Sequence, residues 1–123
     1  MSKNALNIFN ISIYNQLLHD YSLSLNGIIK YNKIYEKMNG YYTKDEIHYI
    51  IEVYINQIVD LINSKTFSLF VPDKVKKEIL KYIPSIRSSF GQGMYNRVIE
   101  LFEKIKDMFF VKVDYNNVID KNM

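Results

Sequence analysis

The sequence lacks cysteine and tryptophan, and its 123 residues include only two prolines, four glycines and two arginines. Without cysteine, neither a disulfide framework nor a thiolate metal site can form. No apolar run approaches the roughly 18 residues that a membrane-spanning helix needs, and residues 1–10 lack the pattern of a secretory signal peptide. We therefore expect no membrane partner and a location in the cytoplasm or within a virus particle.

The charge balance is modest, because sixteen basic residues face thirteen acidic ones and give a net charge of +3. Dedicated nucleic-acid-binding proteins usually carry a larger basic excess and use arginine for bidentate contacts. About half of the chain is Asn, Lys, Ile, Tyr or Phe, whereas alanine occurs once, at Ala5. By the genetic code this bias favours AT-rich codons, which indicates an AT-rich genome of the kind found in many phages, mobile elements and low-GC bacteria.

Helical periodicity predicts a single domain of mainly α class over residues 1–118, followed by a frayed tail at 119–123. The strongest pattern lies at 44–63, where apolar residues recur three and four positions apart behind a capping box that begins at Thr43. A second long helix is predicted at 93–109. We expect these two helices to form the centre of a compact helical fold.

The other segments predict shorter elements. Residues 66–71 are rich in strand-forming residues and stop at Pro72, while residues 111–115 alternate apolar and polar side chains. These two segments could pair as a small two-stranded β-ribbon. Further helices are predicted at 27–38 and 73–83, with breaks at Gly27, Gly40 and Pro84. Residues 4–21 fit a helical face, but residues 10–14 also alternate like a strand; we favour a helix over 4–21 because the alternation is lost after residue 14.

The order of elements in residues 27–71 resembles the helical half of the HU / integration host factor family of DNA-bending proteins. The similar stretches are residues 35–46, which contain the Asn39-Gly40 turn and the helix cap, and residues 67–70. The resemblance covers about a third of the chain and implies a helical unit that intertwines with a second subunit. In that family the strand leads into a basic β-arm that wraps the DNA minor groove. Here Pro72 and another predicted helix follow, so the arm is absent.

One predicted helix carries a basic face. Lys74, Lys77 and Lys81 share that face by their spacing, and Arg87 lies just beyond it. Residues 65–90 contain six basic and two acidic residues, a net charge of +4. Such a face could contact nucleic-acid phosphates or an acidic partner. An ordinary solvated helix face is the alternative, and the charge pattern favours it.

Eleven tyrosines exceed what a small core needs, so several are expected at the surface, where tyrosine is favoured in protein interfaces. The predicted helix at 44–63 is also apolar around much of its circumference and needs cover on more than one side. That cover could come from the centre of the fold or from an oligomer. The interface candidates are Tyr41, Tyr42, Tyr49, Ile55, Val59 and Tyr95.

Catalytic and cofactor motifs are not recognisable. Asp45, His48 and Glu52 share a helix face and could hold a divalent metal, but their positions also continue the wet face of an amphipathic helix. We favour the interpretation that these three residues belong to a solvated helix face and hold no metal. Residues 88–93 contain Gly-Gln-Gly without the lysine and glycine spacing of a phosphate loop, and they predict a flexible corner. The expectation is no enzyme, no metal, no cofactor and no small-molecule substrate.

These patterns favour a non-enzymatic protein–protein interaction or assembly protein that acts as an oligomer. The composition suggests a structural component of a phage or another mobile element. The alternative is a small HU-like architectural protein that binds nucleic acid. Both hypotheses expect self-association or a protein partner, and only the second needs the basic face.

Overall fold

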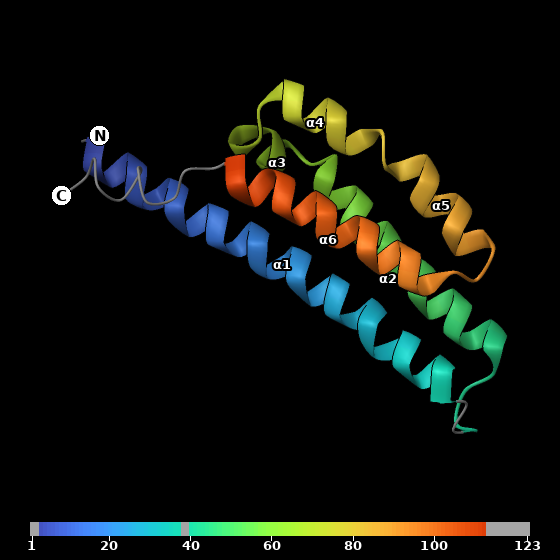
Figure 1. Cartoon of the computed structure of the whole chain (residues 1–123). Helices are drawn as coiled ribbons and strands as arrows, with labels where there is room; N and C mark the ends of the chain where they lie inside the picture. The colour runs from blue at the N-terminus through green and yellow to red at the C-terminus, as the bar shows by residue number, and fades with distance from the viewer. Residues whose placement is uncertain (1–2, 38–39, 113–123) are drawn as a thin grey trace.

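Six helices account for most of residues 3–37 and 40–112, the part of the chain that the computed structural model describes (Figure 1). The mainly α class is confirmed, and the long helices predicted at 44–63 and 93–109 correspond to α2 and α6. The expected domain end at residue 118 and the tail at 119–123 lie outside the described residues. The helices are α1 (Lys3–Lys37), α2 (Lys44–Ile62), α3 (Lys65–Phe70), α4 (Asp73–Leu80), α5 (Ile83–Gly91) and α6 (Tyr95–Lys112).

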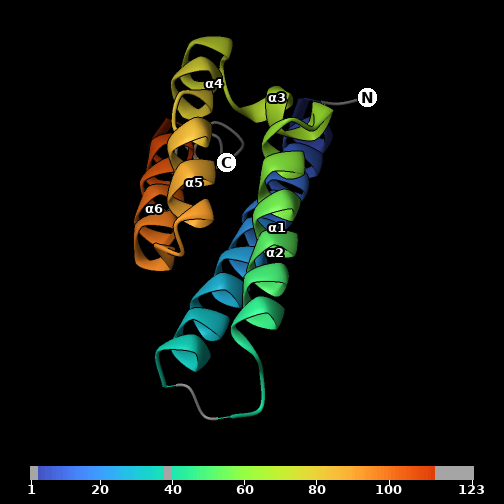
Figure 2. The ribbon, with the colours of Figure 1, turned by 90° about the vertical axis from the view of Figure 1, so that its right-hand side faces the viewer.

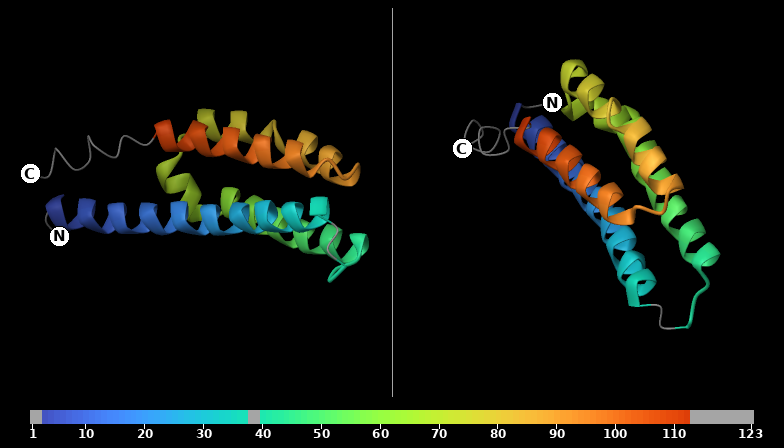
Figure 3. Two further views of the ribbon diagram at one scale, coloured as in Figure 1. Left: turned by 60° about the horizontal axis from the view of Figure 1, so that its bottom comes forward. Right: turned by 45° about the vertical axis from the view of Figure 1, so that its right-hand side comes forward.

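The helices are arranged in two layers (Figure 2). α1 and α2 pack against each other as an antiparallel hairpin, which forms one layer. α4, α5 and α6 form the other layer, and the short helix α3 connects the two. α6 lies along α1 and runs in the opposite direction, as Figure 3 shows. One face of the hairpin is therefore covered by the second layer, and no helix of the described residues covers the opposite face, which we call the open side.

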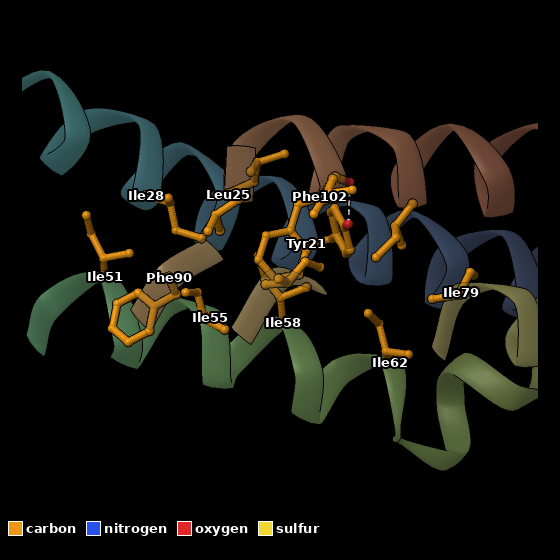
Figure 4. Packing of buried hydrophobic residues seen from close by; sticks show 14 of the residues in the cluster. Tyr21, Leu25, Ile28, Ile51, Ile55, Ile58, Ile62, Ile79, Phe90 and Phe102 are labelled. Carbon is orange, nitrogen blue, oxygen red and sulfur yellow. Dashed lines mark hydrogen bonds between the residues drawn. The ribbon is translucent and has the colours of Figure 1, made fainter. Parts of the chain in front are cut away.

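The core lies between these layers and is built from apolar stripes at helical spacing. α2 contributes an isoleucine stripe that includes Ile51, Ile55 and Ile58, all fully buried (Figure 4). α1 faces this stripe with Tyr21 and other buried residues. Complete burial of one such side chain stabilises the fold by about 1.5–3 kcal/mol before conformational entropy is counted. The further buried apolar and aromatic residues of α1 and α6 are Tyr14, Leu17, Leu25, Ile28, Tyr95, Val98, Leu101, Phe102, Ile105 and Phe109.

The predicted capping box is confirmed at the start of α2. The Thr43 hydroxyl accepts a hydrogen bond from the Glu46 amide at 3.0 Å, and the Glu46 carboxylate accepts one from the Thr43 amide at 2.9 Å. These two bonds satisfy amides that would otherwise lack partners at the helix end. Because Thr43 stabilises the ionised form, the pKa of Glu46 is held below its usual value.

The predicted break at Gly27 is wrong, because α1 continues through it from residue 3 to residue 37. A Cβ at Gly27 would lie 2.5 Å from the ring of Tyr54 on α2, which is closer than real Cβ contacts allow. Gly27 therefore lets α1 approach α2 closely and does not end a helix. The predicted helices at 4–21 and 27–38 belong to one element.

The predicted β-ribbon is also wrong. Residues 65–70 form helix α3, which Ser64 caps: the Ser64 hydroxyl accepts a hydrogen bond from the Phe67 amide at 3.1 Å. Phe67 and Val71, four residues apart, are both buried, whereas Leu69 between them is exposed. That spacing is helical, so tertiary burial overrides the local strand preference. Of the proposed partner strand, residues 111–112 belong to α6 and residues 113–115 lie outside the described part.

Between residues 80 and 94 the helices begin and end at other residues than those predicted from proline and glycine. Pro84 lies in the first turn of α5, where its missing amide costs no intrahelical hydrogen bond, so it begins a helix and does not end one. α4 ends earlier, at Leu80. Residues 88–91 of the predicted flexible corner are helical, and the chain turns just after them, where Gly93 has φ +72°. This left-handed conformation favours glycine.

Tyr21 joins the two layers through a buried hydrogen bond. Its hydroxyl donates to the carbonyl oxygen of Phe102 on α6 at 2.5 Å (Figure 4). Its ring also meets Phe109 edge to face, with the ring centroids 5.1 Å apart. Burial raises the pKa of Tyr21 well above its usual value, and the nearby Asp107 carboxylate adds to the rise. The hydroxyl therefore stays protonated in the folded chain at pH values that ionise an exposed tyrosine.

This raised pKa predicts alkaline sensitivity. Above about pH 10 the unfolded chain releases the Tyr21 proton first, so the stabilisation is complete below that pH and is lost above it, by up to about 1.4 kcal/mol per pH unit. Tyr21→Phe should lower the free energy of unfolding by about 0.5–1.5 kcal/mol at pH 7, through the lost hydrogen bond. It should also reduce the alkaline slope, to which Tyr42 and Tyr95 still contribute through their own raised pKa values. Urea unfolding between pH 7 and pH 11 measures both effects.

The matched control is Tyr49→Phe, since Tyr49 is exposed and its ring lies outside the core. This substitution should change the stability at pH 7 by less than about 0.5 kcal/mol. Equal alkaline slopes for the parent and Tyr21→Phe would show that another group causes the loss of stability.

Candidate functional site

Large apolar side chains are exposed on the open side of the α1/α2 hairpin. Leu23 on α1 is 56% exposed, and Tyr49 and Val53 on α2 are 67% and 38% exposed. Tyr49 and Val53 lie one turn apart, on the side of α2 opposite the buried Ile51, and Leu23 lies opposite the buried Tyr21 on α1. We call Leu23, Tyr49 and Val53 the hairpin face. Exposed apolar side chains gathered on one side of a protein are typical of interaction surfaces.

A groove runs between α1 and α2 and consists of two adjoining hollows of about 510 and 320 Å³. Asp20 and Leu61 line both hollows, and Leu23 of the hairpin face lines the larger one. Within it, the Ser24 hydroxyl donates to the Gln57 side-chain oxygen at 2.9 Å, which ties the two helices together. We call these two hollows the hairpin groove. Its remaining lining residues are Ile13, Gln16, Leu17, Asp60, Ser64 and Thr66.

The hairpin groove carries charge of one sign. Residues 10–29 and 50–64 contain Asp20, Glu52 and Asp60 but no lysine or arginine. Asp20 accepts a hydrogen bond from the Gln16 side-chain amide at 2.8 Å, and in the described ranges neither Asp20 nor Asp60 forms an ion pair. The groove therefore combines apolar walls with two carboxylates, a pattern suited to a partner that has both apolar and cationic side chains.

The predicted basic residues lie elsewhere, mainly on α4. Lys74 and Lys77 are exposed on this helix. Lys81, at its end, pairs with Glu78 at 2.9 Å on the surface. Arg87, on α5, donates to the Asn56 side-chain oxygen of α2 at 2.8 Å. Lys74, Lys77 and Lys81 therefore lie together on α4 or at its end, whereas Arg87 forms a hydrogen bond within the chain.

The predicted interface residues divide between surface and core. Tyr41 and Tyr49 are exposed, and Tyr42 is half-buried with its ring edge to face with Tyr31. The hydrogen bond between Tyr42 and Tyr31 raises the pKa of Tyr42 above its usual value. The other three lie within the chain: Val59 is half-buried against the core, and Ile55 and Tyr95 are buried.

Tyr95 is buried because it belongs to an aromatic cluster. Its hydroxyl and the Nδ1 atom of His48 share a hydrogen bond of 2.6 Å, and the His48 ring stacks on Phe90 with the centroids 3.9 Å apart. Burial raises the pKa of Tyr95, and Tyr35 adds to the rise. This cluster holds α5 and the start of α6 against α2.

The His48 ring thus packs against the core, whereas Asp45 and Glu52 lie on the exposed face of α2. In the described ranges, no three histidine, aspartate or glutamate side chains are grouped as metal ligands. A further hollow of about 450 Å³ lies where α1 meets the start of α6, and Asn32 and Asn96 line it. Their side chains hydrogen-bond each other at 2.8 Å and both donate to Glu36, so these polar groups satisfy one another.

Sequence reasoning missed the hairpin groove because it divided α1 at Gly27 and left residues 22–26 without an element. A helix drawn through Gly27 would have placed Leu23 opposite Tyr21, but only the pairing of α1 with α2 brings Asp20 into the groove. No helix in the described part of the chain is long and apolar enough to cross a membrane. No protein-family model, curated protein or solved structure matches the chain, so the surface itself carries the functional argument.

Proposed function

We propose that this chain is a non-enzymatic assembly protein that associates with a second copy of itself through the open side of the hairpin. The observation that carries the proposal is that Leu23 belongs both to the hairpin face and to the wall of the hairpin groove. An apolar surface that continues into a groove offers area and shape together, and stable interfaces need both. Tyr49 suits such a surface because its ring can pack while its hydroxyl stays wet.

The excess of amino acids that AT-rich codons encode suggests the kind of genome in which this assembly protein acts. We propose a structural component of a phage or another mobile element, since such genomes encode many small assembly proteins. The genes beside this one test the setting: capsid, portal or tail genes would support it, and a replication or repressor operon would contradict it.

The association itself is tested by sedimentation velocity and light scattering across a wide concentration range. The parent chain should form a dimer or a larger species. The triple variant Leu23→Ser, Tyr49→Ser and Val53→Ser should weaken association by about 100-fold or more, because each apolar side chain contributes up to about 1.5–3 kcal/mol when it is fully buried.

The matched control is Leu69→Ser, which removes an exposed apolar side chain from α3 outside the hairpin. This control should associate like the parent. A parent chain that stays monomeric at every concentration contradicts the proposal, and so does a triple variant that associates as strongly as the parent.

Nucleic-acid binding is the second candidate, supported by the exposed Lys74 and Lys77 on α4. Lys81 and Arg87 support it less, because their charged groups already contact Glu78 and Asn56. The same lysines also have a protein surface to which their charge is complementary.

A further inference from the structure

We propose that the occupant of the hairpin groove is helix α4 of a second copy of this chain, bound through its lysines. This inference rests on the proposed self-association and names the two surfaces that meet. The groove presents Asp20 and Asp60 between apolar walls, on a stretch of hairpin that has no lysine or arginine. A complementary partner must supply cations on a narrow element that fits between two helices.

α4 has the required charge and shape. Lys74, Lys77 and Lys81 recur at spacings of three and four residues, so they form one row along the helix. Ile79 is buried against the rest of the fold, which leaves the lysine row outward. Long lysine side chains can lay their methylene stems along apolar walls while their ammonium groups reach carboxylates. The groove offers such walls at Leu23 and Leu61.

The chain's own α4 does not supply this contact. α4 lies in the second layer and packs on α6 (Figures 1 and 2). The groove lies elsewhere, between α1 and α2. In the described ranges no lysine forms an ion pair with Asp20 or Asp60. Because the two surfaces differ, each contact joins α4 of one copy to the groove of another. A two-fold pair makes the contact twice, and an open arrangement makes it repeatedly.

Charge reversal tests the pairing. Asp20→Lys with Asp60→Lys gives a basic groove that repels α4, and Lys74→Glu with Lys77→Glu gives an acidic α4 that repels the groove. Each double variant alone should associate at least about tenfold more weakly than the parent at about 50 mM salt. An equimolar mixture of the two should recover association, since each reversed groove then meets a reversed helix.

The control for the α4 variant is Lys33→Glu with Lys44→Glu, which makes the same change in net charge as Lys74→Glu with Lys77→Glu, at two exposed lysines beside the α1–α2 connection. This control should associate like the parent. Raising the salt to about 500 mM should weaken the parent and the mixture alike, because screening reduces the attraction between the charges. Circular dichroism confirms that every variant is folded.

The outcomes separate this inference from the proposed function. A monomeric parent contradicts both. If the hairpin-face triple variant weakens association while both charge-reversed variants match the parent, self-association stands and α4 is not the occupant. If Lys74→Glu with Lys77→Glu abolishes retention on duplex DNA and leaves self-association intact, α4 serves nucleic acid and the inference is wrong. Recovery in the mixture supports it.

Discussion

Phe67→Ala is expected to lower the free energy of unfolding by about 3–5 kcal/mol, the usual cost of removing a fully buried phenylalanine. Phe67 is completely buried, and its ring meets Phe109 of α6 edge to face with the centroids 5.2 Å apart. Phe109 in turn meets Tyr21 of α1. The alanine variant therefore leaves a cavity where α1, α3 and α6 converge. Urea unfolding at a fixed protein concentration measures the loss.

Leu69→Ala is the matched control, because it removes a large apolar side chain from the same short helix at a position that is 74% exposed. It should change the free energy of unfolding by less than about 0.5 kcal/mol. A strand over residues 66–71 would instead place positions 67 and 69 on the same face. Comparable losses for the two variants would therefore contradict the helical assignment of α3.

Gly27→Ala is expected to destabilise the fold by about 1–2 kcal/mol, although the same change usually stabilises a helix interior by about 0.5–1 kcal/mol. The added methyl group would overlap the Tyr54 ring, which covers Gly27 where α1 approaches α2. That ring also packs near Tyr31, with the centroids 6.2 Å apart. It must give up this packing to make room. Thermal or urea unfolding measures the net effect.

A double-mutant cycle identifies the cause. In a Tyr54→Leu background the distal ring atoms are gone, so Gly27→Ala should become stabilising by about 0.5–1 kcal/mol. Asn26→Ala, at the neighbouring exposed position of α1, should be neutral or slightly stabilising in both backgrounds. If Gly27→Ala stabilises the parent chain as well, the Tyr54 ring moves aside freely and does not fix the approach of the helices.

The parts of the fold that the sequence predicts best depend on local chemistry. The cap at Thr43 needs only Glu46, three residues away, and the isoleucine stripe of α2 needs only helical spacing. Both are confirmed. The bounds of α6 also follow closely from its apolar period. Such features are visible in a window of a few residues, whatever the rest of the chain does.

The parts that the sequence mispredicts depend on distant residues. Gly27 looks like a break until Tyr54 is known to lie on it, and residues 66–71 look like a strand until Phe109 is known to bury Phe67. The groove could not be foreseen for the same reason, since Asp20 and Asp60 line one hollow only once α1 and α2 pair. Tyr95 was expected at the surface, but its hydrogen bond with His48 places it inside.

The hydrogen bond from Tyr21 to Phe102 has a consequence for synthesis of the chain, because its two residues are 81 positions apart. At the roughly 5–20 residues per second of translation, Phe102 follows Tyr21 by about 4–16 s. During that interval α2 can pair with α1 on the ribosome, but α6 does not yet exist to cover the hairpin's inner side. The nascent hairpin therefore displays the stripe that includes Tyr21 and Leu25 to chaperones until the last described helix has emerged.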